Sequence, residues 1–224
     1  MAHGSVVKGG FIPGCSDIDL QLYLENQAFT ISGHLPLELC LAIQKDLSKI
    51  DPAPFQYIQC HAYSRRLPPG KVGPIPGAYT VIAGSLPIGE ATAQELYDAA
   101  KKALTTLDIA PAYISEGLLE HGGGRLALQL RWLCTDVWPT LYHVLTLQQD
   151  DPIYIWSLPK EKAIELLPSG TTLGQAIRVF YQAVQLYYPA CSSVEQALLV
   201  IKNGVAFLQV AKSWLDEEKG ESTA

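Results

Sequence analysis

The spacing of apolar residues changes near residue 90, and this change constrains the fold more than any other feature of the sequence. Before it, apolar residues come in short runs. From Ser16 to Glu25 (SDIDLQLYLE) they alternate with polar residues, which is typical of a half-buried strand. After it they recur three and four residues apart, as from Ser193 to Leu215, which predicts helices. We therefore predict an α+β fold, with a small mixed β-sheet domain over residues 1–88 and an antiparallel helical bundle over residues 89–224.

Individual elements follow from the same patterns. In the first part we expect a helix over residues 35–50 and strands over residues 16–25, 55–63 and 78–83. In the second part, Thr92 with Glu95 and Ser193 with Gln196 have the spacing of a capping box, which marks helix starts. The helices expected there cover residues 92–107, 125–147, 173–188 and 193–215, and Pro139 is expected to kink the second of them.

Apolar runs, net charge and cysteine pattern argue against several classes of protein. No apolar run reaches the roughly 18 residues of a membrane span, and no basic segment followed by an apolar one marks a secretory signal. The net charge is −6 and no basic stripe is visible, so we expect neither a nucleic-acid nor a membrane partner. Five scattered cysteines without a CxxC pair indicate reduced thiols. These features predict a cytoplasmic protein and leave its oligomeric state open.

Two aspartates carry the clearest chemical signal. Asp17 and Asp19 are two residues apart on a predicted strand, so both carboxylates project from the same face. Neighbouring carboxylates repel each other unless a cation lies between them. Mg²⁺ prefers oxygen ligands and often uses one or two carboxylates together with substrate phosphates. The pair therefore predicts a site for Mg²⁺ and a nucleotide, although a lone Asp-x-Asp is more often surface charge.

A loop of small residues precedes the aspartates. Gly4 and Ser5, followed by Gly9 and Gly10, allow backbone N–H groups and a hydroxyl to approach phosphate oxygens, especially if a helix starts at Ser5. Lys8 could reach a phosphate or lie on a solvated turn. Ser16 could bind a phosphate or cap the turn.

This stretch, HGSVVKGGFIPGCSDIDLQLYL, resembles the signature of the DNA polymerase β-like nucleotidyltransferase superfamily, and especially of the aminoglycoside nucleotidyltransferases. The order of an α/β catalytic domain and a helical bundle is also similar. The resemblance implies that Gly4 and Ser5 bind phosphate and that Asp17 and Asp19 bind Mg²⁺. It implies transfer of a nucleoside monophosphate, AMP from ATP in its simplest form, to a hydroxyl of a small molecule such as an aminoglycoside.

The chain departs from the family pattern in two ways. The family adds a third carboxylate on a neighbouring strand, where this sequence offers Gln56 or Gln59. The helical half could supply the acid instead, with Glu90 and Glu120 as catalytic candidates beside Glu116. Only three residues precede Gly4, so either the first strand is minimal or the sequence begins downstream of a natural start. A missing strand would leave an open sheet edge.

Two other functions remain open from the sequence. A neutral glutamine in place of the third acid is compatible with a nucleotide-binding regulatory protein with weak or no catalysis. A minimal nucleotidyltransferase could instead adenylylate a partner protein, as relatives modify toxins with HEPN helices, which the bundle loosely resembles. A ribonuclease site in this bundle is not expected. Its arginines, Arg125, Arg131 and Arg178, are not followed by His at the gap of four to six residues that such enzymes use.

Overall fold

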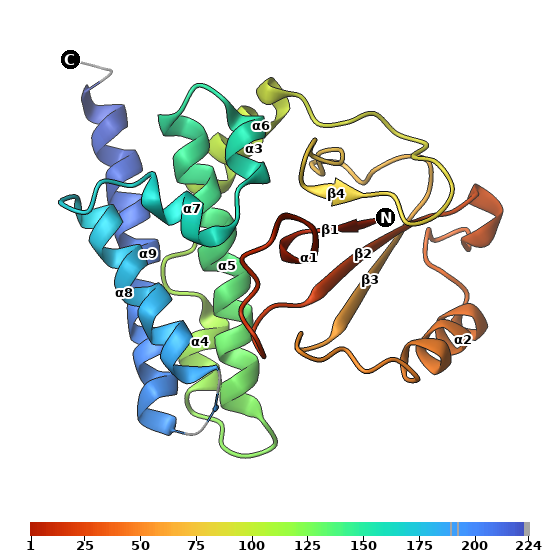
Figure 1. Ribbon diagram of the computed structural model, residues 1–224, viewed down its shortest axis with the longest axis horizontal. Coiled ribbons are helices and arrows are strands. Elements are labelled where there is room, and N and C mark those ends of the chain that lie inside the picture. The colour runs from red at the N-terminus through yellow and green to blue at the C-terminus, as the bar shows by residue number, and fades with distance from the viewer. Residues whose placement is uncertain (189, 192, 222–224) are drawn as a thin grey trace. The chain divides into compact units, whose positions relative to one another are not determined.

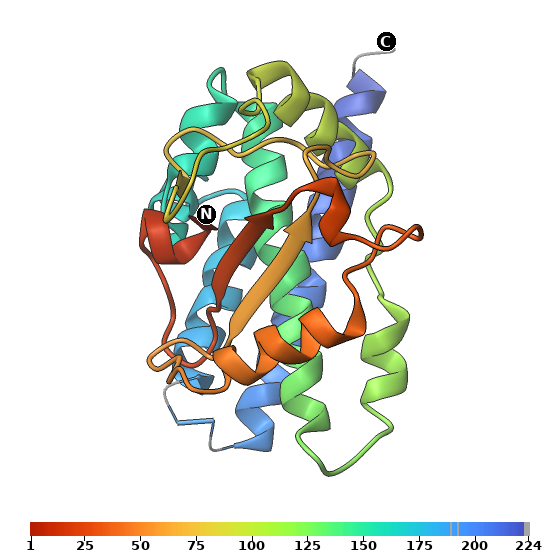
Figure 2. The same cartoon turned by 90° about the vertical axis from the view of Figure 1, so that its right-hand side faces the viewer.

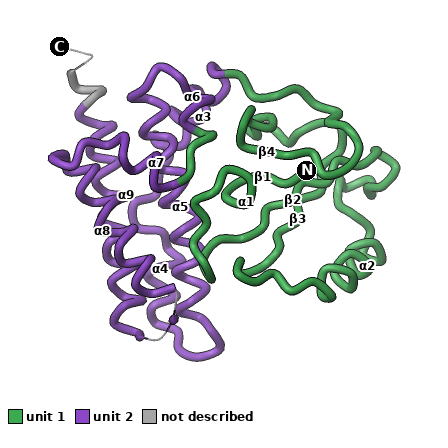
Figure 3. The backbone as a smooth tube through the Cα atoms, viewed as in Figure 1, with its two compact units in different colours: residues 1–92, 156–159 green, residues 93–155, 160–224 purple. Residues whose placement is uncertain are grey.

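The computed structural model describes residues 1–188, 190–191 and 193–221. Over these residues the chain is α+β, which confirms the predicted fold class: a mixed four-stranded sheet is followed by a series of helices (Figure 1). The chain divides into two compact units (Figure 3). Unit 1 holds residues 1–92 and 156–159, and unit 2 holds residues 93–155 and the described residues from 160 onward.

The sheet of unit 1 has the strand order β3-β2-β1-β4. Strands β2 (Ile18–Tyr23) and β3 (Ile58–Tyr63) pair in parallel, in a register that sets Asp19 beside Gln59. Figure 2 shows these two strands side by side and running in the same direction. Both were predicted from the alternation of polar and apolar residues. Residues between the two strands form the short 3-10 helix η1 (Asn26–Ala28) and helix α2 (Leu37–Leu47), the latter within the predicted range.

The first strand is present but minimal. Strand β1 (Ala2–His3) pairs antiparallel with β2 on one side and with β4 (Tyr79–Thr80) on the other. Its ladder is extended by the terminal ammonium of Met1, which donates to the Gln21 carbonyl at 2.8 Å, and by the Gln21 N–H, which donates to the Met1 carbonyl at 2.9 Å. The strand expected over residues 78–83 forms only at Tyr79–Thr80, because β1 offers only two residues for it to pair with. Helix α1 (Ser5–Lys8) follows β1 directly.

Unit 2 is built from helices, and the four long ones begin and end within about two residues of the predicted bounds, except that the last continues beyond its predicted end at residue 215. They are α3 (Ala93–Thr105), α5 (Arg125–Gln148), α8 (Thr172–Tyr187) and α9 (Val194–Glu221), and Pro139 lies inside α5. Helices α4 (Ala112–Gly117), α6 (Pro152–Ser157) and α7 (Lys160–Glu165) were not predicted, because six residues are too few to display a helical period.

The core of unit 2 forms where α3 and α9 pack on α5 and where α8 packs on α9. Leu133, Phe180 and Phe207 are completely buried there. Gly204 of α9 allows the close approach: a Cβ at this position would lie 2.6 Å from Leu133 Cδ2, so any larger residue would push α9 away from α5.

Helix α9 departs from the expectation, based on the lengths of apolar runs, that no segment resembles a membrane span. In the described part of the chain, its stretch Val194–Glu217 has the length and mean hydropathy of a membrane span. Several of its apolar residues, including Val200, Phe207 and Leu208, are core residues of unit 2. Only part of the stretch is buried, since 39% of its most apolar window lies inside the structure and Val194, Leu198 and Leu199 are exposed.

Candidate functional site

A row of four side chains crosses the sheet of unit 1. The register places Gln59 beside Asp19, Asp19 opposite His3, and His3 opposite Tyr79. Residues directly opposite each other on paired strands project from the same face. The order Gln59, Asp19, His3, Tyr79 therefore runs across one face of the sheet from β3 to β4.

Gly4 lies directly against Asp19. Its φ of +75° is a conformation that side-chain-bearing residues rarely adopt, and a Cβ at this position would be only 2.7 Å from Asp19 Oδ2. Both the backbone angle and the available space therefore require glycine. This contact brings the Gly-Ser pair and the Asp-x-Asp pair together on the same sheet face.

Asp17 comes directly before β2, two residues from Asp19, so an extended chain at this point would place both side chains on one face. Its Oδ2 atom accepts a hydrogen bond of 2.5 Å from the hydroxyl of Tyr57. The backbone fixes this pairing, because the Ile18 N–H donates to the Tyr57 carbonyl at 3.0 Å. Sequence reasoning missed Tyr57. The available signal was the spacing of Tyr57 and Gln59, which repeats that of Asp17 and Asp19 on the neighbouring strand.

Ser5, Lys8 and Ser16 have different surroundings. Ser5 is buried and begins α1, whose first turn is closed by hydrogen bonds of 3.1 Å from the Val7 and Lys8 N–H groups to the Gly4 carbonyl. The Lys8 ammonium donates to the Trp156 carbonyl of unit 1 at 3.0 Å. Ser16 is buried, and its hydroxyl accepts a hydrogen bond of 2.9 Å from the Ile12 N–H. This bond caps the turn, and because the hydroxyl can still donate its own hydrogen, the phosphate role considered for Ser16 stays a prediction.

His3 is a further polar group of the row that the sequence did not single out. Its Nε2 atom is buried and has no hydrogen-bond partner among the described residues. Burial, followed by the charge of His61, lowers the pKa of His3 to about 4, against the opposing influence of Asp17. The imidazole is therefore neutral near pH 7. Its position immediately before Gly4 was the only signal in the sequence.

The position of the expected third acid is occupied by Gln59, which is in register with Asp19; Gln56 precedes β3 and has no place in the row. Of the glutamates considered, Glu90 belongs to unit 1 and not to the helical part, and it accepts a hydrogen bond of 2.6 Å from the hydroxyl of Tyr79. Glu120 belongs to unit 2, where its Oε2 lies 3.4 Å from Arg125 Nε in an exposed ion pair. Glu116 is on α4 of the same unit.

Metal binding depends on the two aspartates. Within the described residues, no three His, Cys, Asp or Glu side chains are grouped as metal ligands. Mg²⁺ does not require such a group, since it often keeps several waters and takes one or two carboxylates together with phosphate oxygens. Asp17 and Asp19 are the carboxylates of this region that could hold such an ion, and Asp19 is the one in contact with Gly4.

Comparison with known proteins identifies no relative. No family model matches the chain, and no curated protein or solved structure is significantly similar to it.

Proposed function

We propose that unit 1 is a metal-dependent nucleotidyltransferase that moves a nucleoside monophosphate, most simply AMP from ATP, to a hydroxyl of a small molecule. The observation that carries this proposal is the contact between Gly4 and Asp19. It joins a small-residue loop suited to phosphate with a pair of carboxylates suited to Mg²⁺. The resemblance of the N-terminal stretch to aminoglycoside nucleotidyltransferases points to the same chemistry.

Each residue of the site has a role in this reaction. Gly4 and Ser5 hold the triphosphate, while Asp17 and Asp19 hold Mg²⁺, which would neutralise charge on the phosphates as pyrophosphate leaves. The acceptor hydroxyl attacks the α-phosphorus in line, its oxygen forms the new P–O bond, and the bond to pyrophosphate breaks. Positioning of the two reactants supplies most of the rate.

We assign the general base to Glu90. It lies in unit 1 and is tied by Tyr79 to the row that contains Asp19. Its carboxylate would accept the proton of the attacking hydroxyl. Glu120 is the weaker candidate because it belongs to the other unit and is paired with Arg125. The acidic net charge of −6 favours a cationic acceptor such as an aminated sugar.

The test is Mg²⁺-dependent release of pyrophosphate from ATP in the presence of a broad panel of aminated and neutral sugar alcohols. Asp19→Asn should lower the rate by about a hundredfold or more. Asp46→Asn is the matched control, since Asp46 is an exposed aspartate of α2 that pairs only with Lys49. A folded wild-type protein that turns over no acceptor of the panel would count against transfer to small molecules.

Gln59 motivates a second candidate function, a nucleotide-binding protein without transfer. A neutral amide beside Asp19 contributes less negative charge to the metal than a carboxylate and cannot act as a base. This function predicts that calorimetry detects binding of Mg²⁺–ATP while no acceptor is modified. Gln59→Glu would then strengthen binding of Mg²⁺, because it adds the missing charge at that position.

A further inference from the structure

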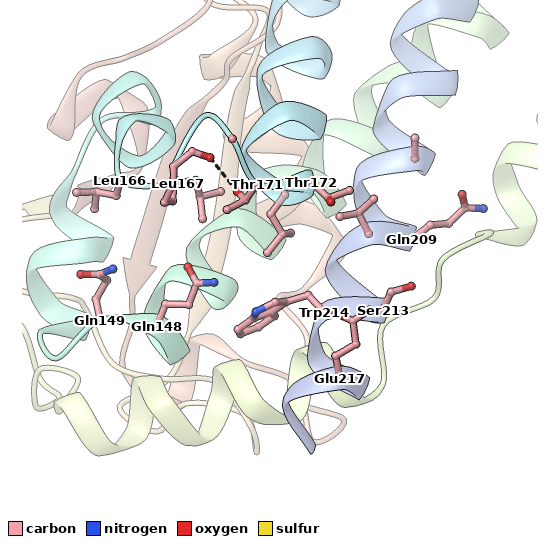
Figure 4. A pocket seen from close by; sticks show the side chains of 15 residues that line it. Gln148, Gln149, Leu166, Leu167, Thr171, Thr172, Gln209, Ser213, Trp214 and Glu217 are labelled. Carbon is pink, nitrogen blue, oxygen red and sulfur yellow. Dashed lines mark hydrogen bonds between the residues drawn. The ribbon is translucent and has the colours of Figure 1, made fainter. Parts of the chain in front are cut away.

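Unit 2 contains a cavity that the proposed nucleotidyl transfer does not use. Its volume is about 930 Å³, within the range of small-molecule sites. It lies where the C-terminal end of α5, the α7–α8 loop and the last turns of α9 come together (Figure 4). All of its lining residues belong to unit 2.

One wall of the cavity is held in place by Arg178, a residue of α8. Its guanidinium donates to the carbonyls of Gly174, Leu167 and Ile164 at 2.7, 2.6 and 3.1 Å. The Thr171 hydroxyl closes the loop by donating to the Pro168 carbonyl at 2.8 Å, and it accepts from the Gly174 N–H at 3.1 Å. With its backbone fixed in this way, the α7–α8 loop is a preformed wall, which lowers the entropy that a ligand loses on binding.

The lining combines apolar side chains, among them Leu166, Leu173 and Val210, with polar ones, and it carries little charge. Three glutamines and three hydroxyl-bearing residues are among the lining residues, and among the described residues no lysine, arginine or histidine lines the cavity. Glu217 provides the only charge of the described lining. The amides and hydroxyls belong to Gln148, Gln149, Gln209, Thr171, Thr172 and Ser213.

An indole ring completes the site. Figure 4 shows Trp214 extending from α9 toward the side of the cavity lined by Gln148. Its ring is half-buried and therefore keeps one part accessible. The face of an aromatic ring carries partial negative charge and attracts the polarised C–H groups of a sugar ring or a nearby ammonium group. Phosphorylated ligands would meet Glu217, with no lysine, arginine or histidine among the described lining residues to compensate its charge.

We propose that this cavity binds a sugar ring, neutral or aminated, that stacks on Trp214 while the glutamine amides bind its hydroxyls. The amides can donate and accept hydrogen bonds at the same time, as sugar hydroxyls require. The carboxylate of Glu217 adds affinity for an aminated sugar and rejects an anionic one. This site lies within unit 2 and does not depend on the proposed transfer reaction.

Ligand-observed NMR titrations with maltose, glucosamine and glucose 6-phosphate, in the absence of ATP and Mg²⁺, test the proposal. We expect the full chain to bind maltose or glucosamine and to bind glucose 6-phosphate about tenfold more weakly or worse. Trp214→Ala should weaken binding about tenfold. Gln148→Ala, at an exposed position where folding is not at risk and on the side of the cavity toward which Trp214 extends, should weaken it several-fold.

Gln182→Ala provides the matched control, because Gln182 is an exposed glutamine of α8 outside the cavity. It should leave affinity unchanged. Absence of binding to both uncharged and aminated sugars overturns the proposal, as does binding that neither Trp214→Ala nor Gln148→Ala alters. Because no nucleotide is present, these outcomes are independent of whether unit 1 transfers AMP.

Discussion

The carboxylate of Asp19 lies against the Cα of Gly4, so closely that a methyl group on Gly4 would come within 2.7 Å of Oδ2. The contact joins the end of β1 to β2 at the point where the loop that begins α1 leaves the sheet. It is the geometric basis of the proposed site, since phosphate-binding and metal-binding groups must lie within one nucleotide's reach of each other.

Gly4→Ala should therefore be harmful for two separable reasons. The first is strain, because alanine at a φ of +75° costs about 1 kcal/mol or more. The second is the clash with Asp19. Gly9→Ala measures the strain without the clash, because Gly9 has a φ of +79° and nothing lies within 4 Å of an added Cβ. Urea unfolding should show a larger loss in the free energy of unfolding for Gly4→Ala than for Gly9→Ala. The rate of pyrophosphate release should fall only in Gly4→Ala. Equal losses in both variants would contradict the role of the contact.

Tyr57→Phe should weaken the site through Asp17. The tyrosine hydroxyl donates a hydrogen bond of 2.5 Å to the carboxylate and so fixes its orientation. A hydrogen bond to a charged group contributes about 1.5–3 kcal/mol when buried, and about 1 kcal/mol is expected at this half-buried position. We also expect the Mg²⁺ concentration needed for half-maximal pyrophosphate release to rise, because the site is weakened. Tyr97→Phe, at an exposed tyrosine of α3, should change neither quantity.

Glu90→Gln tests the assignment of the general base. Loss of the base should lower kcat by about a hundredfold or more while leaving KM for ATP nearly unchanged. Tyr79→Phe should have a smaller effect on kcat, because it removes only the hydrogen bond that orients Glu90. Glu120→Gln is the comparison that decides between the two acids. If it abolished turnover while Glu90→Gln did not, the base would have to be assigned to unit 2.

Acid should destabilise unit 2 through His143. Burial within α5 lowers the pKa of His143 to about 4, whereas the unfolded chain has a value near 6.5. Between these values the unfolded state binds the additional proton. The contribution of the neutral His143 side chain to the free energy of unfolding is therefore complete above about pH 6.5. It declines by about 1.4 kcal/mol per pH unit as the pH falls toward 4.

Urea unfolding between pH 7 and pH 4, followed by tryptophan fluorescence, measures this contribution. His143→Phe should reduce the pH dependence, because it removes one titrating group and preserves an aromatic side chain, while His3, whose pKa is also lowered, stays in place. His34→Phe serves as the control, since His34 lies on an exposed turn of unit 1. An identical pH dependence in wild type and His143→Phe would be inconsistent with the lowered pKa.

Local patterns were sufficient for the longer elements. Alternation over residues 16–25 predicted β2, and apolar spacing predicted α3, α5, α8 and α9, because side-chain periodicity records which face of an element is buried. The pairing of Asp17 with Asp19 on one face follows from the same period of two. Short elements such as α7 contain less than two helical turns and leave no such record.

The sequence by itself thus determined the α+β class, the main elements and the two aspartates that share a face. Only the tertiary structure decided that Gly4 contacts Asp19, that Gln59 is the residue in register with it, and that Tyr57, His3 and Glu90 belong to the same unit. The reason is physical: periodicity specifies the face on which a side chain lies, but neighbours across a sheet are set by strand order and register. These depend on contacts between residues that are far apart in the chain.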